Sequence, residues 1–170
     1  DLRADTVDLF GKRIHEVKLN AGPTPNGWRG QLASREAAGE LTWLAEGKGL
    51  LRAQLKHLLV PSDTPETPNP PPQANSTTSD PLPALEISAE SFAYGDKTLG
   101  RLDLNASNQG RDWRIEKLSI VNPESTLTMD GRWRDWLAQP KTEVNLQLDI
   151  KDAGKFLTRI GYANALKRGT

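Results

Sequence analysis

The side chains that could carry out chemistry are few and lie far apart in the sequence. His15 and His57 stand alone on predicted strands, so we interpret them as partly exposed structural residues rather than catalytic or metal-binding ones. The chain has no cysteine, which excludes disulfides, thiolate metal sites and cysteine nucleophiles. It also has no phosphate-binding loop, serine-nucleophile motif or calcium-binding loop. The sequence therefore predicts no enzyme activity, no metal site and no cofactor.

Five tryptophans are the other side chains that could recognise a ligand. Trp28 and Trp113 occupy equivalent places in two similar segments, which favours a repeated packing role over ligand binding. Trp43, Trp133 and Trp136 lie near predicted strand ends, where an amphipathic ring can lie at a solvent-exposed edge of the sheet. Exposed aromatic clusters can bind sugars or proteins, but the sequence does not single out that role here.

Charge and hydropathy exclude further classes of function. The chain carries 22 basic and 22 acidic side chains, so no overall field attracts nucleic acid or an anionic membrane. No apolar run approaches the roughly 20 residues that span a bilayer. The first residues already alternate as a strand does, and they do not read as a signal peptide. We therefore expect a fragment of a longer protein.

The sequence contains an internal similarity. Residues 2–29 and 87–114 align without a gap, and their apolar positions coincide. The triplet Leu-Asn-Ala at 19–21 recurs at 104–106. Identities are few, so the pattern of apolar positions carries most of the weight. We predict two copies of one β-rich unit, and repetition at this scale usually extends a surface rather than forming one catalytic pocket.

Alternation of apolar and polar residues predicts ten strands joined by short turns, which is typical of antiparallel meanders. The strands are expected near 2–9, 12–21, 28–35, 39–46 and 50–59, and near 85–94, 97–106, 112–121, 125–134 and 142–150. The alternation changes parity within the first strand of each unit, which predicts β-bulges near Asp5-Thr6 and Glu90-Ser91. Asp152 as N-cap and Gly161 as terminator predict a short helix between them.

We therefore predict a mainly β fold in which two repeated five-stranded antiparallel meander units form a curved β-groove sheet, with a short C-terminal helix. The first unit is expected over 1–60 and the second over 85–150. Residues 61–84 form a Pro-rich linker that holds most of the 12 prolines. Residues 151–170 contain the helix.

The apolar face of such sheets needs a cover. A helix over 152–160 would be only about 14 Å long, which is too short to cover both units. Two arrangements stay open: the sheets close on each other as a sandwich, or they join edge to edge around an open apolar trough. A trough of that size would be an interaction site, and hydrocarbon chains would suit it because their binding needs area rather than directional bonds.

Apolar residues of one strand parity are the candidates for lining that trough. The opposite parity stays open, because a register shift of one residue would exchange the two sets. The candidates are Val17, Leu19, Leu41, Trp43, Leu51 and Leu55 in the first unit, and Leu102, Leu104, Leu127, Met129, Val144, Leu146 and Leu148 in the second.

Several segments resemble the AsmA-like superfamily, and within it the large YhdP-type proteins of Gram-negative bacteria. The segments are LPALEI at 82–87, FAYGD at 92–96, LGRL at 99–102, LNA at 104–106, WRI at 113–115 and DAGKFL at 152–157. The resemblance covers nearly all of the second unit and, more loosely, the first. Each motif is a β-packing pattern, and the order and spacing together are distinctive.

This resemblance implies a periplasmic location, with the parent protein anchored in the inner membrane by an N-terminal helix. It implies repeated β-groove units, each of about five strands and a crossing segment, with a hydrophobic interior thought to conduct phospholipid. Residues 61–83 and 151–170 match the crossing segments by position.

The leading hypothesis is a non-enzymatic segment that carries phospholipid between the inner and outer membranes. Its partners would be phospholipid acyl chains and neighbouring repeat units of the parent chain. The alternative is a scaffold with a sealed β-sandwich core that contacts envelope proteins.

Overall fold

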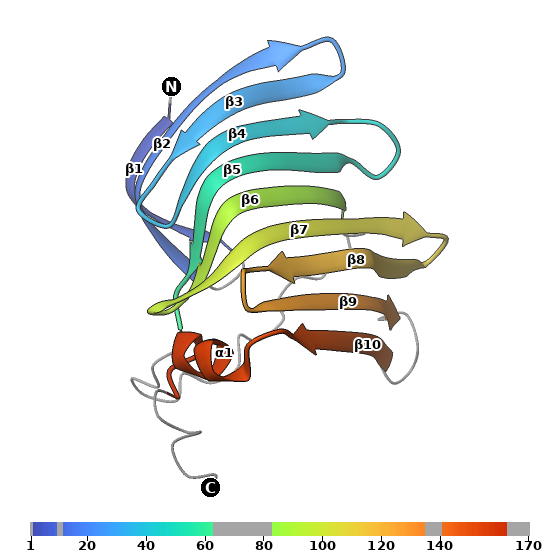
Figure 1. Ribbon diagram of the computed structural model, residues 1–170. Coiled ribbons are helices and arrows are strands. Elements are labelled where there is room, and N and C mark those ends of the chain that lie inside the picture. The colour runs from blue at the N-terminus through green and yellow to red at the C-terminus, as the bar shows by residue number, and fades with distance from the viewer. Residues whose placement is uncertain (1, 10–11, 63–82, 135–140, 163–170) are drawn as a thin grey trace, which may run out of the picture.

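The fold consists of one large sheet and one short helix (Figure 1). The computed structural model describes residues 2–9, 12–62, 83–134 and 141–162. Its elements are β1 (Leu2–Leu9), β2 (Lys12–Thr24), β3 (Gly27–Ala33), β4 (Ala37–Leu44), β5 (Leu50–Val60), β6 (Ala84–Tyr94), β7 (Lys97–Gln109), β8 (Asp112–Val121), β9 (Ser125–Arg134), β10 (Lys141–Ile150) and α1 (Ala153–Arg159). The predicted mainly β fold with a short C-terminal helix is confirmed. Most of the predicted linker and the end of segment 151–170 lie outside the described residues.

The ten strands form a single sheet in the order β1 to β10, and the strands bend over their length (Figure 1). Neighbours pair antiparallel, except for β5 and β6, which run parallel. The chain re-enters the sheet at Ala84 opposite Leu50, so the connection from β5 returns to the end where β5 began. The sandwich alternative is therefore wrong, because the two sets of five strands join edge to edge.

The β-bulge predicted near Glu90-Ser91 is confirmed. The register between β6 and β7 shifts between Ala89 and Phe92, on either side of that dipeptide. An extra residue on one strand increases the local twist and redirects the side chains that follow. This bulge allows Ala89 and Phe92 to belong to the same apolar cluster despite their odd spacing.

The irregularity predicted near Asp5 takes another form. The register of β1 and β2 is the same on both sides of Asp5, so the expected shift of one residue is wrong. Asp5 and Glu16 are instead left out of the pairing opposite each other, and Glu16 has a φ of 56°. Because the interruption falls on both strands at the same level, the residue counts stay equal and the register does not shift.

The turn between β3 and β4 is fastened to β2 by the buried side chain of Glu36, which is 4% exposed. One Glu36 carboxylate oxygen accepts a hydrogen bond from the backbone N–H of His15 at 2.8 Å, and the other lies 2.7 Å from His15 Nδ1. The backbone oxygen of Glu36 accepts from the N–H of Leu59 at 2.6 Å. His15 thus has a structural partner that links β2, this turn and β5.

The Glu36 anchor predicts an acid-sensitive contribution to stability. Burial raises the pKa of Glu36, but the hydrogen bonds from His15 outweigh it and hold the pKa below its ordinary 4.5. The contribution is therefore complete above about pH 4.5 and is lost as pH falls through the lowered pKa. Glu36→Gln should lower the free energy of unfolding at pH 7 by about 1–3 kcal/mol and flatten its decline in acid. Urea unfolding between pH 3 and 7 measures both effects.

The exposed Glu46, which accepts a hydrogen bond from the Asn26 side chain, provides the matched control. Glu46→Gln should leave the acid limb as steep as in the parent protein. If Glu36→Gln gave that same steep limb, the assignment of the acid sensitivity to Glu36 would be wrong.

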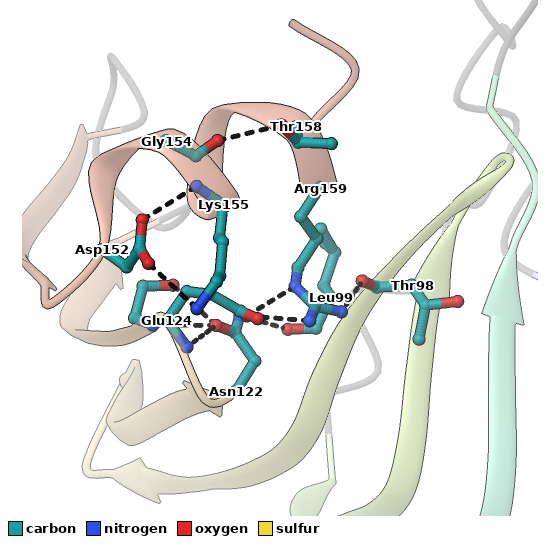
Figure 2. A network of polar contacts seen from close by, with 10 residues as sticks. Thr98, Leu99, Asn122, Glu124, Asp152, Gly154, Lys155, Thr158 and Arg159 are labelled. Atoms are coloured by element: carbon teal, nitrogen blue, oxygen red, sulfur yellow. Dashed lines mark hydrogen bonds and ion pairs between the residues drawn. The ribbon is translucent and has the colours of Figure 1, made fainter. Parts of the chain in front are cut away.

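Helix α1 is fixed against the ends of β7 and β9 by a polar network (Figure 2). Asp152 caps the helix by accepting from the N–H of Lys155 at 3.0 Å, as its sequence position predicts. Arg159 donates through Nε to Glu124 Oε2 at 2.9 Å and through Nη1 to the Thr98 backbone oxygen at 3.2 Å. No residue of the helix is fully buried, and Arg159 joins the helix to β7 and to the turn before β9.

Arg159→Ala should therefore detach α1 without unfolding the sheet. A helix of seven residues is marginal by itself, so its amide hydrogens should exchange at least tenfold faster once the Arg159 contacts are lost. Hydrogen exchange followed by mass spectrometry over 153–159 measures this change. Lys155→Ala removes an exposed cation from the same helix and should have a much smaller effect. Equal exchange in the two variants would contradict the assigned role of Arg159.

Candidate functional site

The sheet carries apolar side chains along one face, from β2 to the edge strand β10. Residues directly opposite each other on neighbouring strands project to the same face, so the pairing register defines rows that cross the sheet. The first row contains no polar residue from β2 to β10. It runs Leu19, Leu32, Gly39, Leu55, Ala89, Leu102, Ile120, Leu127 and Leu148.

Two more rows on the same face are also apolar throughout. The second row is Ala21, Gly30, Leu41, Ala53, Ile87, Leu104, Leu118, Met129 and Leu146. The third row is Pro23, Trp28, Trp43, Leu51, Leu85, Ala106, Ile115, Gly131 and Val144. At strand spacings of about 4.8 Å and residue rises of about 3.4 Å, the band is roughly 40 Å long and 14 Å wide. We call these three rows the apolar face.

The opposite face is polar. Arg52 on β5 forms an ion pair with Glu86 on β6, with Nε 2.6 Å from Oε2. Asn145 on β10 donates to Asp130 on β9 at 3.0 Å. One face of the sheet is therefore apolar and the other polar, as the alternation of residues in the sequence predicts.

Exposure on the apolar face changes along the sheet. In the middle, Leu55 is 7% exposed and Leu102 is 6% exposed, and both belong to one packed cluster. On β10, Val144 is 51% exposed, Leu146 61% and Leu148 42%. Among the described residues, no strand pairs with the outer edge of β10. The apolar face is thus open, and it is most accessible at this edge.

The structure places all thirteen candidate lining residues on the side of the sheet that carries the apolar face. Twelve of them belong to the three rows, and Val17 lies two residues before Leu19 on β2. Val17 itself is buried, at 7% exposure. The register thus places the candidate residues on a common surface, and their role in binding lipid stays a prediction.

Sequence reasoning missed several members of this face. Ile115 and Leu118 both belong to it although three residues separate them, because the β8–β9 register shifts between them. Simple alternation would have assigned the two residues to opposite faces. Trp28, which belongs to the third row, was interpreted as a packing residue, although its pairing with Trp43 puts both rings on this face.

One end of the apolar face forms an aromatic pocket of about 280 Å³. Its lining is Trp113, Ile115, Gly131, Arg132, Trp133, Thr142 and Val144. The rings of Trp113 and Trp133 meet edge to face, with centroids 6.5 Å apart and planes at 83°. Trp113 Nε1 donates to the Pro83 backbone oxygen at 3.0 Å, so its polar atom is satisfied. Trp133 is 42% exposed, which leaves the pocket open to a ligand.

Within the described residues, no group of three or more histidine, aspartate or glutamate side chains lies close enough together to hold a metal ion. The same part of the chain has no helix that is long and apolar enough to cross a membrane. The apolar face and the aromatic pocket together form the candidate site.

The chain matches one known protein family over its whole length. The family described as YhdP protein matches residues 1–170, the whole sequence. This chain belongs to the YhdP family. The resemblance seen in the sequence is thus confirmed over both halves of the YhdP-family chain. No curated protein and no solved structure matches it.

Proposed function

We propose that this YhdP-family chain is a non-enzymatic segment of a periplasmic protein, anchored in the inner membrane, that carries phospholipid between the inner and outer membranes. The acyl chains lie on the apolar face, which serves as the groove. The observation that carries this proposal is the continuity of the three rows, in which no polar side chain interrupts the apolar surface from β2 to β10.

An apolar surface of this size is unfavourable when it is exposed to water. Monomeric proteins rarely leave contiguous apolar patches of more than a few hundred Å² uncovered. The band of roughly 40 by 14 Å is of that size or larger, and one short helix cannot cover it. Acyl chains gain about 0.8 kcal/mol per buried CH₂ group and need no hydrogen-bonding partner. A surface with uniform apolar rows also allows a chain to move along it without a large barrier.

Neighbouring repeat units of the parent chain are the second proposed partner. Within the described part of the chain, no strand pairs with the outer edge of β10, which carries exposed apolar side chains. The parallel β5–β6 pairing shows how one set of five strands can join another in register, with Leu55 opposite Ala89. An equivalent pairing at β10 would prolong all three rows into the next unit.

Native mass spectrometry of the purified chain, together with lipid extraction from a parallel sample, tests the proposal. We expect adducts with phospholipid masses, which added phospholipid should increase. A protein that carries no lipid and also binds none from added dihexanoyl phosphatidylglycerol would overturn the proposal and direct attention to protein partners.

A further inference from the structure

The aromatic pocket lies where a glycine interrupts the third row of the apolar face. Gly131 stands between Ile115 on β8 and Val144 on β10, its direct partners in the pairing register. Gly131 is buried, and its missing side chain leaves room between these two apolar neighbours. Trp133, two residues further along β9, projects to the same face and borders this room. Gly131 thus forms the floor of the pocket, and apolar side chains form its walls.

The charged side chains near the pocket belong to the opposite face of the sheet. Arg132 is part of the lining, but it alternates with the pocket residues of β9, so its side chain projects to the polar face. Its direct partners there are Arg114 on β8 and Glu143 on β10. The indole N–H of Trp113 already donates to a backbone oxygen. The described lining therefore offers an occupant apolar area and the hydroxyl group of Thr142, but no charge.

In the middle of the apolar face, large side chains fill the places beside small residues. Along the first row, Leu55 stands between Gly39 and Ala89, and Leu102 follows Ala89. Leu55 is 7% exposed, Ala89 1% and Leu102 6%, and the three pack in one cluster. A hydrocarbon chain could enter this part of the face only by displacing close-packed side chains. The aromatic pocket, by contrast, is open without any rearrangement.

The corresponding tryptophan pair in the first half of the chain is packed. Trp28 and Trp43 stand directly opposite each other, as the two tryptophans of the pocket do. The ring of Trp43 lies against the turn at Gly49, where a Cβ atom would be only 2.5 Å from it. The nearby glycine of β3, Gly30, is closed in by Ala21, whose Cβ would be 2.7 Å from an added Cβ. The two ends of the apolar face therefore differ in the space that they offer.

We propose that the aromatic pocket holds one acyl chain of a phospholipid and selects the lipid by this chain rather than by its head group. The inference rests on the proposed function and adds the place on the apolar face where a chain is held most tightly. A hydrocarbon chain gains from apolar area alone, whereas a phosphate or ammonium group would lose hydration in the pocket without a charged partner. From the pocket the chain continues onto Val144 and Leu146, the most exposed apolar residues described on β10.

The test is titration calorimetry of the intact 170-residue chain with three soluble probes. These are dihexanoyl phosphatidylglycerol, dihexanoyl phosphatidylcholine, which has the same chains and a zwitterionic head, and glycerophosphoglycerol, which has no chains. We expect the affinities of the two lipids to agree within about threefold, because a charged hydrogen bond to one head group would separate them by about tenfold or more. The probe without chains should not bind.

Variants of the pocket locate the bound chain. Gly131→Val should lower the affinity for both lipids at least tenfold, because its side chain displaces about two methylene groups that each contribute about fourfold. An added Cβ at Gly131 would lie 2.9 Å from the Glu143 backbone oxygen, so Trp133→Ala, which adds no bulk, serves as a second variant with the same expected loss. Trp28→Ala, the matched change in the first half, should leave both affinities unchanged.

The other outcomes separate this inference from the proposed function. Lipid binding that neither Gly131→Val nor Trp133→Ala weakens, or that Trp28→Ala weakens equally, would overturn the pocket while leaving the apolar face as a lipid surface. A preference of about tenfold or more for one head group would overturn selection by the chain. Binding of neither lipid would overturn both proposals. Thermal unfolding of each variant identifies any loss of affinity caused by misfolding.

Discussion

Leu146→Asp is expected to lower the affinity of the chain for phospholipid at least tenfold and to block transport in the parent protein. Leu146 lies in the second row of the apolar face and, at 61% exposure, is the most accessible member described on β10. A carboxylate at this position would lose hydration as an acyl chain covered it, with no partner to compensate. Lipid retained by the purified variant, measured by native mass spectrometry, gives the result directly.

The exposure of Leu146 also makes this variant easy to interpret. Substitutions at exposed positions usually change the free energy of unfolding by less than about 0.5 kcal/mol, so the variant should still fold. Gln147→Asp is the matched control, because Gln147 is the next residue on β10, is also exposed and pairs with Thr128 on the polar face. It places the same charge on the same strand and should retain lipid. A folded Leu146→Asp protein that bound and transported lipid normally would show that the lipid path lies elsewhere.

Gly100→Ala is expected to destabilise the sheet by about 3 kcal/mol or more. Gly100 lies on β7 with a φ of 118°, a region that residues with a side chain rarely adopt. A Cβ atom there would lie 2.2 Å from the backbone oxygen of Val121 on β8. The β7 backbone cannot simply move away, because the Asn122 side chain donates to the neighbouring Leu99 oxygen at 2.7 Å. Strain and steric overlap therefore add together.

The midpoint of urea unfolding checks this prediction, with Gly110→Ala as the control. Gly110 also has a positive φ, 65°, but no atom lies within 4 Å of the place where its Cβ would be. Its substitution should cost only about 1 kcal/mol, the usual penalty for the left-handed conformation. Equal destabilisation by the two substitutions would show that the close approach to Val121 contributes nothing.

Most of the strands could be predicted because each one carries its own signal. In β10, Val144, Leu146, Leu148 and Ile150 alternate with polar residues, and the predicted strand near 142–150 agrees with Lys141–Ile150. The N-cap at Asp152 likewise depends on residues within one turn of the helix. Such signals are local, so a single sequence contains them in full.

Register was harder to predict, because a bulge can lie anywhere along a pair of strands. The pairing shift in β8 brings Ile115 and Leu118 to the same face, and nothing in their spacing requires it. At Asp5 the parity change was read correctly as an irregularity, but its form depended on the φ of Glu16 on the neighbouring strand. The conformation of one strand was thus decided together with its partner.

The sequence by itself determined the amphipathic strands, the short capped helix, the absence of cysteine chemistry and the resemblance that the family assignment confirmed. Only the tertiary structure decided between a sandwich and an open sheet, through the parallel pairing of β5 and β6. It also placed Trp113 opposite Trp133, with their rings edge to face. The alternation specifies which side chains of each strand form an apolar face. Which strands pair depends on contacts between residues far apart in the chain, and no local pattern encodes these contacts.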